Sequence, residues 1–266
     1  MTTSIPTRSQ GERADQTRAR ILSAAVSQFS ENGLAGARTE LIAEAAGVNK
    51  ALLYYYFKSK DALYSVALES VFDDVRADSD AVLQANTSVG ERFLQIVLNN
   101  FDRSYTHPYM KSFMQQEMVR LHRGEENALG RMAEKFFKPM WVRIQELLKE
   151  GVASGELIQV DPMQIHYVSI GANVFYFLTA PLTRLAFKID PLEREALKAR
   201  RKTAIEFLGQ GIFIDRKHGA RVAARVLAAT PMPKCNAPAN GTSANIKSVK
   251  DNIEAAGTST TEARNK

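Results

Sequence analysis

Cysteine is almost missing from this 266-residue chain, in which Cys235 stands alone. A single cysteine excludes an internal disulfide framework and is typical of a reducing cytoplasm. No apolar run is long enough to span a bilayer, and the polar start MTTSIPTRSQGERADQTR lacks the apolar segment of a secretory signal. We therefore expect a cytoplasmic protein without a membrane partner.

Patterns that bind metals or perform catalysis are also missing. The four histidines show no i, i+4 pairing and no cysteine lies among them, so metal-ligand spacing is absent. There is no glycine-rich phosphate loop, no G-x-S-x-G and no H-E-x-x-H. The sequence therefore predicts no metal, no cofactor and no enzymatic activity.

The positive charge is unevenly distributed. Residues 216–266 hold nine Lys/Arg and three Asp/Glu, which accounts for the whole net charge of +6. Residues 1–60 hold eight basic and five acidic side chains, whereas residues 61–80 hold one basic and six acidic side chains. The global charge thus says little about nucleic acid, but the first 60 residues are locally positive.

The stretch 38–57 is predicted to form two short helices joined by a tight turn. Thr39 is the expected N-cap of the first helix. Gly47 stands where a helix C-terminus needs a left-handed residue, and Asn49 is placed to cap a second helix at 50–56. A helix, a short turn containing glycine and a second helix form a helix-turn-helix.

The second of these helices carries side chains suited to DNA. Lys50 and tyrosines 54–56 crowd this segment, and Lys58 and Lys60 follow it. Hydroxyl and ammonium groups contact phosphates, while the N-terminal residues of a recognition helix reach base edges. The alternative is that the aromatics are core, but a two-turn helix cannot bury every face, so Tyr55 should point outward. The expected DNA-contacting residues are Arg38, Thr39, Asn49, Lys50, Ala51, Leu52, Tyr54, Tyr55, Tyr56, Lys58 and Lys60.

Further residues in and around this motif follow a specific pattern. They are Ile21, Ala24, Ala25, Phe29, Gly33, Thr39, Ile42, Ala43, Ala46-Gly47-Val48, Leu53-Tyr54, Tyr56-Phe57, Lys60 and Leu63. Over residues 15–75 this pattern resembles the DNA-binding domain of the TetR/AcrR family of bacterial transcriptional regulators. Asn49 replaces a common serine, and Ala51-Leu52 replaces Gly-Thr or similar pairs, which affects the expected operator sequence rather than the resemblance. The resemblance implies a homodimeric repressor that binds a two-fold double-stranded DNA operator and responds to a small-molecule effector.

Helical periodicity continues beyond the motif, and no stretch shows convincing strand alternation. Helices are expected at about 15–32, 60–83, 89–105, 108–122, 125–153 with a kink or restart at Pro139, 161–180 and 191–215. The segment ARVAARVLAA at 220–229 is a further candidate for a short basic helix. The sequence thus predicts an all-α fold with an N-terminal helix-turn-helix head and a larger helical ligand-binding and dimerisation domain. The expected parts are a flexible arm at 1–14, the head at 15–75, the helical domain at 76–216 and a basic, mostly disordered tail at 217–266. Residues 230–266 have too few large apolar side chains to offset the entropy of ordering.

The helix at 161–180 is apolar nearly all round, and the later half of 191–215 is also apolar. An all-apolar helix is buried on every side, either in a monomeric core or in a four-helix contact with a second copy. The resemblance favours the dimer. Aromatic, methionine and polar residues suggest a chamber for a small, largely apolar ligand, although such stripes are more often plain core. The candidates are Phe101, Tyr105, Met110, Phe113, Met114, Met118, Phe137, Trp141, His166, Asn173 and Tyr176. A helical scaffold that does not bind DNA is the alternative function.

Overall fold

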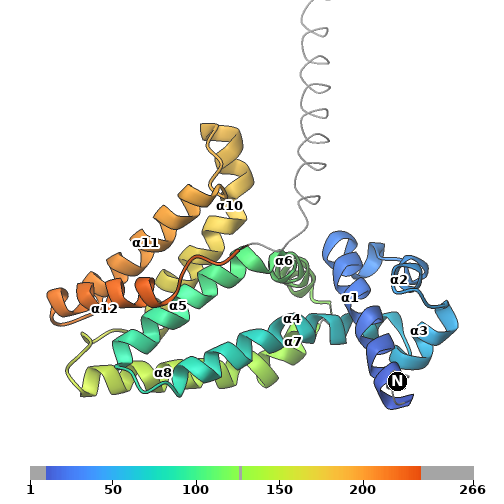
Figure 1. The fold of residues 1–266 in the computed structure, drawn as a ribbon, viewed down its shortest axis with the longest axis horizontal. Coiled ribbons are helices and arrows are strands. Elements are labelled where there is room, and N and C mark those ends of the chain that lie inside the picture. Colours follow the sequence, from blue (N-terminus) through green and yellow to red (C-terminus); the bar gives the residue numbers. More distant parts are fainter. Residues whose placement is uncertain (1–9, 126–127, 235–266) are drawn as a thin grey trace, which may run out of the picture. The chain divides into compact units, whose positions relative to one another are not determined.

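The computed structural model describes residues 10–125 and 128–234 (Figure 1). Within these residues every regular element is a helix, and one isolated bridge joins Leu157 to Phe213. The all-α prediction is therefore confirmed for the part of the chain that the structure describes. None of the described helices is long and apolar enough to cross a membrane. The helices belong to one compact unit, Met1–Pro233, and most of the predicted tail, from residue 235, lies outside the described residues.

Three helices pack around an apolar centre to form the head. They are α1 (Gln10–Gly36), α2 (Thr39–Ala45) and α3 (Lys50–Phe57). Phe29 of α1, Ile42 of α2 and Leu53 of α3 are fully buried in one cluster. The first helix is already formed at Gln10, five residues before the predicted start, and Glu12 in its first turn suits the positive end of the helix dipole. Residues 10–14 of the predicted arm are thus helical, and residues 1–9 lie outside the described part.

The helix that leaves the head, α4 (Lys60–Leu83), belongs to two apolar cores. The Ser59 hydroxyl accepts a hydrogen bond from the Ala62 amide at 3.0 Å and so caps the N-terminus of α4. Near its start Tyr64 is buried among the head residues, and near its end Leu83 packs against the core of the larger domain. Because one rigid helix enters both cores, a tilt of α4 moves the head relative to the larger domain.

The larger domain is built around α5 (Val89–Thr106). The helices packed against it are α4, α8 (Lys138–Ala153), α10 (Ala172–Phe187), α11 (Arg194–Gly211) and α12 (Arg216–Ala229) (Figure 1). Phe93, Val97 and Leu98 of α5 are almost fully buried in this core. The strong apolar periodicity of the sequence at 89–105 arises from this central position.

The predicted boundary of the tail at residue 217 is wrong, because α12 is part of the core. Val222, Ala223 and Val226 are buried, and α12 packs closely on α11. A side-chain carbon placed on Gly219 would lie 1.8 Å from the Gly209 carbonyl oxygen. The two helices therefore meet at paired glycines. Small residues allow this approach, so α12 needs little apolar bulk and its sequence resembles a solvated segment.

Two predicted long helices contain a widened π-type turn. The segment expected at 125–153 consists of α7 (Ala128–Met132), the π turn Ala133–Phe137 and α8, which has Pro139 in its first turn. Proline lacks a backbone donor, so the helical ladder changes register just before it. The segment expected at 161–180 consists of α9 (Pro162–His166), the π turn Tyr167–Gly171 and α10, which continues to Phe187.

The expectation that the helix at 161–180 is buried on every side is wrong for the single chain. Phe175 is 64% exposed and Leu182 is 62% exposed, and further apolar side chains of this segment reach solvent. These are Tyr167, Val168, Val174, Leu178, Leu185 and Phe187. The segment covers α5 with one side only and leaves an apolar stripe on the other.

Candidate nucleic-acid interface

The turn between α2 and α3 is closed by backbone hydrogen bonds. Gly47 has a positive φ of 64°, its amide donates to the Glu44 carbonyl at 2.9 Å, and the Val48 amide donates to the Ala43 carbonyl at 2.9 Å. This is a Schellman closure, which favours glycine at the left-handed position. The Asn49 side chain then accepts from the Leu52 amide at 2.8 Å. The predicted turn and cap are confirmed, and they hold the start of α3 in one orientation.

One side of α3 is buried and the other is free. Leu53 and Phe57 face the head core, whereas Tyr55 is 79% exposed, as the sequence predicts. Lys50, Ala51 and Leu52, at the N-terminal end of α3, are also exposed. The helix therefore presents an ammonium group, two apolar side chains and a phenol to solvent. These groups are suited to base edges in a major groove.

The expected role of Thr39 as an N-cap is wrong. Arg38 occupies the N-cap position with extended backbone and makes no side-chain cap. Thr39 is 6% exposed, and its hydroxyl lies 3.2 Å from the Tyr54 hydroxyl of α3. A threonine that faces the neighbouring helix cannot also turn back onto its own amides. Thr39 and Tyr54 therefore fix the position of α3 on α2.

Charged side chains flank the exposed face of α3. The Lys50 ammonium hydrogen-bonds Glu40 of α2, which lowers the pKa of that carboxyl and raises the pKa of the lysine. Lys58 is exposed and has a positive φ of 61°, which is uncommon for a residue with a side chain. The Lys60 ammonium donates to the Ala35 carbonyl at 3.2 Å. Two cations thus follow α3. No local pattern predicts the pairing of Glu40 with Lys50, because the two residues lie ten positions apart on different helices.

The residues predicted to line one ligand chamber lie in separate groups. One group packs against the head core at the joint with the larger domain, where Phe113 is fully buried. Its other members are Met110, Met114 and Phe137. Met118, on the same helix α6 (Pro108–His122), is 38% exposed.

A second group of predicted ligand residues lies between α5 and α10. Phe101 is buried, its ring centroid is 6.0 Å from that of Tyr176, and Tyr105 packs against the same cluster. The Tyr176 hydroxyl donates to the Pro191 carbonyl at 2.5 Å, and burial raises its pKa. Asn173 is 1% exposed and donates to the Val97 carbonyl at 3.1 Å. Asn173 is thus occupied by the protein.

Trp141 and His166 form a third group, with ring centroids 5.2 Å apart. Burial lowers the pKa of His166, so the imidazole is neutral at pH 7. The buried His166 Nδ1 has no hydrogen-bond partner among the described residues. A buried polar atom without a partner costs free energy. A ligand that hydrogen-bonds to this Nδ1 would remove that cost, so this pair is a better candidate ligand site than the other two groups.

A buried carboxylate that the sequence reasoning missed joins the head to the larger domain. Glu117 of α6 is fully buried and accepts hydrogen bonds from the Tyr64 hydroxyl at 2.9 Å, Arg120 at 2.7 Å and the Leu129 amide at 2.9 Å. The adjacent Gln116 donates to the Ser30 carbonyl of α1 at 3.0 Å. We call these residues the Glu117 joint. It fixes α6 to α1, α4 and α7, and its one sequence signal is an acid within a methionine-rich helix.

Two family models match this chain, the first over the head and the second over the larger domain. The model described as "Bacterial regulatory proteins, tetR family" matches residues 21–67, which contain the helix-turn-helix. The model described as "Tetracyclin repressor-like, C-terminal domain" matches residues 91–208 of the larger domain. The chain belongs to the TetR family.

Curated relatives named as transcriptional regulators match part of this chain. The HTH-type transcriptional repressor NicS of Pseudomonas putida is 34% identical over 116 residues, which are 43% of this chain and 53% of NicS. The HTH-type transcriptional regulator RutR of Escherichia coli is 55% identical over 53 residues, which are 20% of this chain and 25% of RutR. The chain thus matches about half or less of the length of these relatives.

Solved structures of transcriptional regulators share the fold over most of the chain. A transcriptional regulator of the TetR/AcrR family from Thermobifida fusca is 24% identical with a TM-score of 0.55, and the match covers 75% of this chain and 98% of that one. FadR from Bacillus subtilis, crystallised with stearoyl-CoA, is 20% identical with a TM-score of 0.55, and the match covers 72% and 97%. At these identities the likeness establishes the TetR fold.

Proposed function

We propose that this TetR-family chain is a dimeric transcriptional repressor that a small, largely apolar ligand releases from its operator. The observation that carries the proposal is the free face of α3, where Lys50 and Tyr55 project from a helix fixed by the Gly47 turn and the Asn49 cap. Relatives named as repressors, such as NicS, support the regulatory role. The family consists of regulators rather than enzymes.

The proposed DNA contacts divide by position on the head. Lys50 and Tyr55 stand at the exposed side of α3 and would contact base edges. Tyr56, Lys58 and Lys60 stand at its C-terminal end and would contact phosphates. The Lys50 pair with Glu40 is exposed, so it contributes little and exchanges readily for a contact to DNA.

The proposed dimer uses the apolar stripe of α10 together with α11. Phe175 and Leu182 lie seven residues apart on α10, which places them on one side of the helix. Phe207 of α11 is 69% exposed and adds an aromatic ring. Large exposed apolar patches mark interaction sites. A two-fold contact through 161–180 and 191–215 would cover the stripe in both copies and would place two heads on a two-fold operator.

The proposed effector binds within the larger domain. The Trp141 and His166 pair supplies an aromatic surface and one unpaired polar atom. Solved proteins with this fold include FadR in complex with stearoyl-CoA and a γ-butyrolactone receptor, which supports an apolar effector. A ligand that displaces α6 would disturb the Glu117 joint and so tilt α4. We place the protein in the bacterial cytoplasm, where it would meet the nucleoid.

Selection of bound genomic fragments by the full-length chain tests the proposal. Fragments sharing a two-fold motif should be enriched, and their affinity should fall steeply as salt rises, because each neutralised phosphate releases counterions. A matched selection with the Lys50→Ala/Tyr55→Ala variant should lose that motif. Recovery of no sequence by the wild-type chain, or of the same motif by the variant, would favour the helical scaffold that does not bind DNA.

A further inference from the structure

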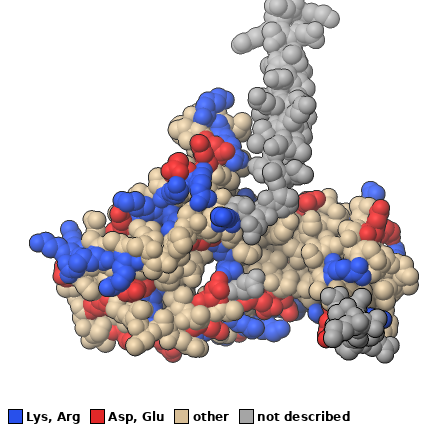
Figure 2. All heavy atoms as spheres, viewed as in Figure 1, with Lys and Arg blue, Asp and Glu red and all other residues tan. Residues whose placement is uncertain are grey.

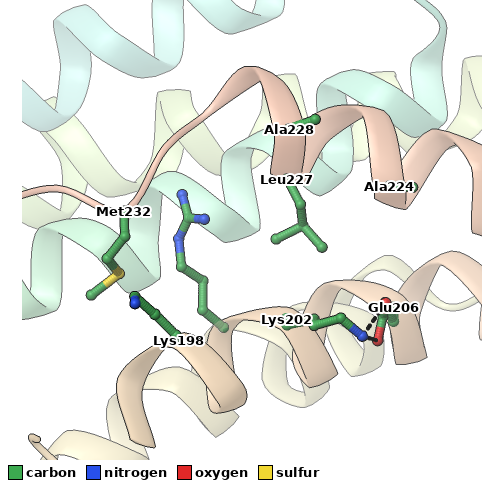
Figure 3. A pocket seen from close by; sticks show the side chains of 8 residues that line it. Lys198, Lys202, Glu206, Ala224, Leu227, Ala228 and Met232 are labelled. Carbon is green, nitrogen blue, oxygen red and sulfur yellow. Dashed lines mark hydrogen bonds and ion pairs between the residues drawn. The ribbon is translucent and has the colours of Figure 1, made fainter. Parts of the chain in front are cut away.

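A groove of about 350 Å³ runs between α11 and α12, a volume at the lower end of the range for ligand sites (Figure 3). In Figure 3 Met232 and Lys198 lie at one end of the groove, Lys202 runs along α11 to its partner Glu206 at the other end, and Leu227 of α12 lies on the opposite side. The remaining lining residues are Arg201, Ala224 and Ala228. Lys and Arg side chains also gather over this helix pair on the face shown in Figure 2.

Arg201 supplies a fixed cationic group at this groove. Its guanidinium is almost fully buried and donates to both carboxylate oxygens of Asp102 at 2.7 Å, and to the Thr230 carbonyl at 2.7 Å. These bonds use Nε and Nη2, whereas Nη1 donates to no residue that the structure describes. Asp102 and the Thr230 carbonyl thus fix the position of the guanidinium, and its Nη1 remains to donate a hydrogen bond to an anion.

The two lysines of the groove can exchange their present glutamate partners for a bound anion. Lys198 pairs with Glu195 one turn earlier at 2.6 Å, and Lys202 pairs with Glu206 one turn later at 2.6 Å. All four side chains are more than a third exposed. Pairs of this kind within one exposed helix face contribute little to stability, so a ligand carboxylate can replace either glutamate.

The groove combines these cations with an apolar wall from Leu227, Met232 and the two alanines. It also lies away from the proposed dimer contact. Phe207 is nine residues from Lys198, and at 3.6 residues per turn this places the two side chains on opposite sides of α11. The groove therefore stays open when the Phe207 side of α11 is covered.

We propose that this groove binds a small amphipathic carboxylate, with the carboxylate between Arg201 and the two lysines and the hydrocarbon along Leu227 and Met232. The site is distinct from the effector site near Trp141 and goes beyond the proposed repressor function. Charge complementarity selects an anion, and the apolar wall selects a hydrocarbon over inorganic phosphate.

Calorimetric titration of the full-length chain with decanoate, without DNA, tests this site independently of operator binding. One decanoate should bind per chain, and decanol and decyltrimethylammonium should bind at least about tenfold more weakly, because charge-assisted hydrogen bonds are lost. The Lys198→Glu/Lys202→Glu variant should weaken decanoate binding by at least about tenfold. Lys149→Glu, which reverses an exposed charge outside the groove, should leave it unchanged.

A second variant keeps every charge and fills the space. Ala228 is exposed at the groove, so Ala228→Trp is compatible with folding, which circular dichroism would check, and it should abolish decanoate binding. Equal binding of decanol, binding that persists in both groove variants, or no decanoate binding by the folded wild-type chain would overturn the proposal. Capture by anionic vesicles without binding of free decanoate would overturn it as well.

Discussion

At the scale of single residues, Tyr55 and Lys50 are the polar side chains on the exposed side of α3, and the head core buries neither of them. We expect Tyr55→Ala and Lys50→Ala to change which operator sequences bind, since each base contact contributes about 1–3 kcal/mol of discrimination. Titration against an operator and its single-base variants measures this change.

The matched controls for these substitutions are Tyr56→Phe and Lys60→Ala. Both alter groups proposed to contact phosphates, so they should weaken all sequences alike. Lys60→Ala, which removes a positive charge, should also flatten the salt dependence, whereas Tyr56→Phe should not. Unchanged affinity and preference in Tyr55→Ala and Lys50→Ala would show that α3 does not contact the bases.

The hydroxyl pair between Thr39 and Tyr54 gives a second residue-scale prediction. Thr39→Val keeps the shape of this buried side chain but removes the hydroxyl, and should lower the free energy of unfolding by about 1 kcal/mol. In a Tyr54→Phe background the same substitution should cost much less, because the partner is already gone. Denaturant unfolding of the four proteins measures the coupling, and additive losses would show that the hydrogen bond contributes nothing.

The residues whose roles could be predicted are those that interact with residues close to them in the sequence. The left-handed Gly47 and the Asn49 cap depend on backbone groups within five residues, so their residue types indicate their conformations. Thr39 was misassigned because its partner is fifteen residues away on another helix. One partner of Glu117, the Tyr64 hydroxyl, is 53 residues away, and no pattern in the sequence predicts that the two residues meet.

At the scale of helices, the contact of α11 with α12 depends on two glycines. Gly219→Ala should lower the free energy of unfolding by about 2 kcal/mol or more, because its added carbon would meet the Gly209 backbone and force the helices apart. Gly211→Ala is the matched control, since a side chain there meets nothing within 4 Å. Equal thermal melting of the two variants would contradict the close approach of these helices.

The periodicity of apolar residues predicts where the helices lie in the chain. It predicts less well where each helix packs in the fold. The stripe of α5 and the cap of α4 identify those elements directly. The core position of α12 was missed because glycine and alanine replace the bulky residues that usually reveal burial. The candidate ligand residues were predicted to line one chamber but lie in three separate groups. Periodicity predicts which face of a helix is buried, but not which helix packs against that face.

The Glu117 joint gives a prediction for how helices are held together. Glu117→Ala should lower the free energy of unfolding by about 3–5 kcal/mol, because Arg120, Tyr64 and a backbone amide lose a buried partner. Glu125→Ala removes an exposed acid that pairs with the same arginine, so it should change stability little. Similar chemical denaturation curves for the two variants would show that the buried carboxylate does not stabilise the joint.

At the scale of the whole molecule, DNA binding requires two heads at the spacing of one duplex turn, about 34–36 Å. Phe175→Glu/Leu182→Glu should convert the dimer to monomers in analytical ultracentrifugation and weaken operator binding, because both side chains lie on the apolar stripe of α10. Val119→Glu changes another exposed apolar residue outside that stripe and should leave the dimer intact. A dimer that persists in the double variant would place the contact elsewhere.

The last prediction links the ligand to the operator. An effector beside Trp141 and His166 should change the emission of Trp141, the one tryptophan in the chain, and lower operator affinity. By linkage the DNA-bound form must bind that ligand more weakly by the same factor. Because the signal has to cross the Glu117 joint to reach α4, Glu117→Gln should alter this factor while ligand affinity without DNA stays close to wild type. A ligand that releases the operator without changing Trp141 emission would place the effector site in another of the three groups.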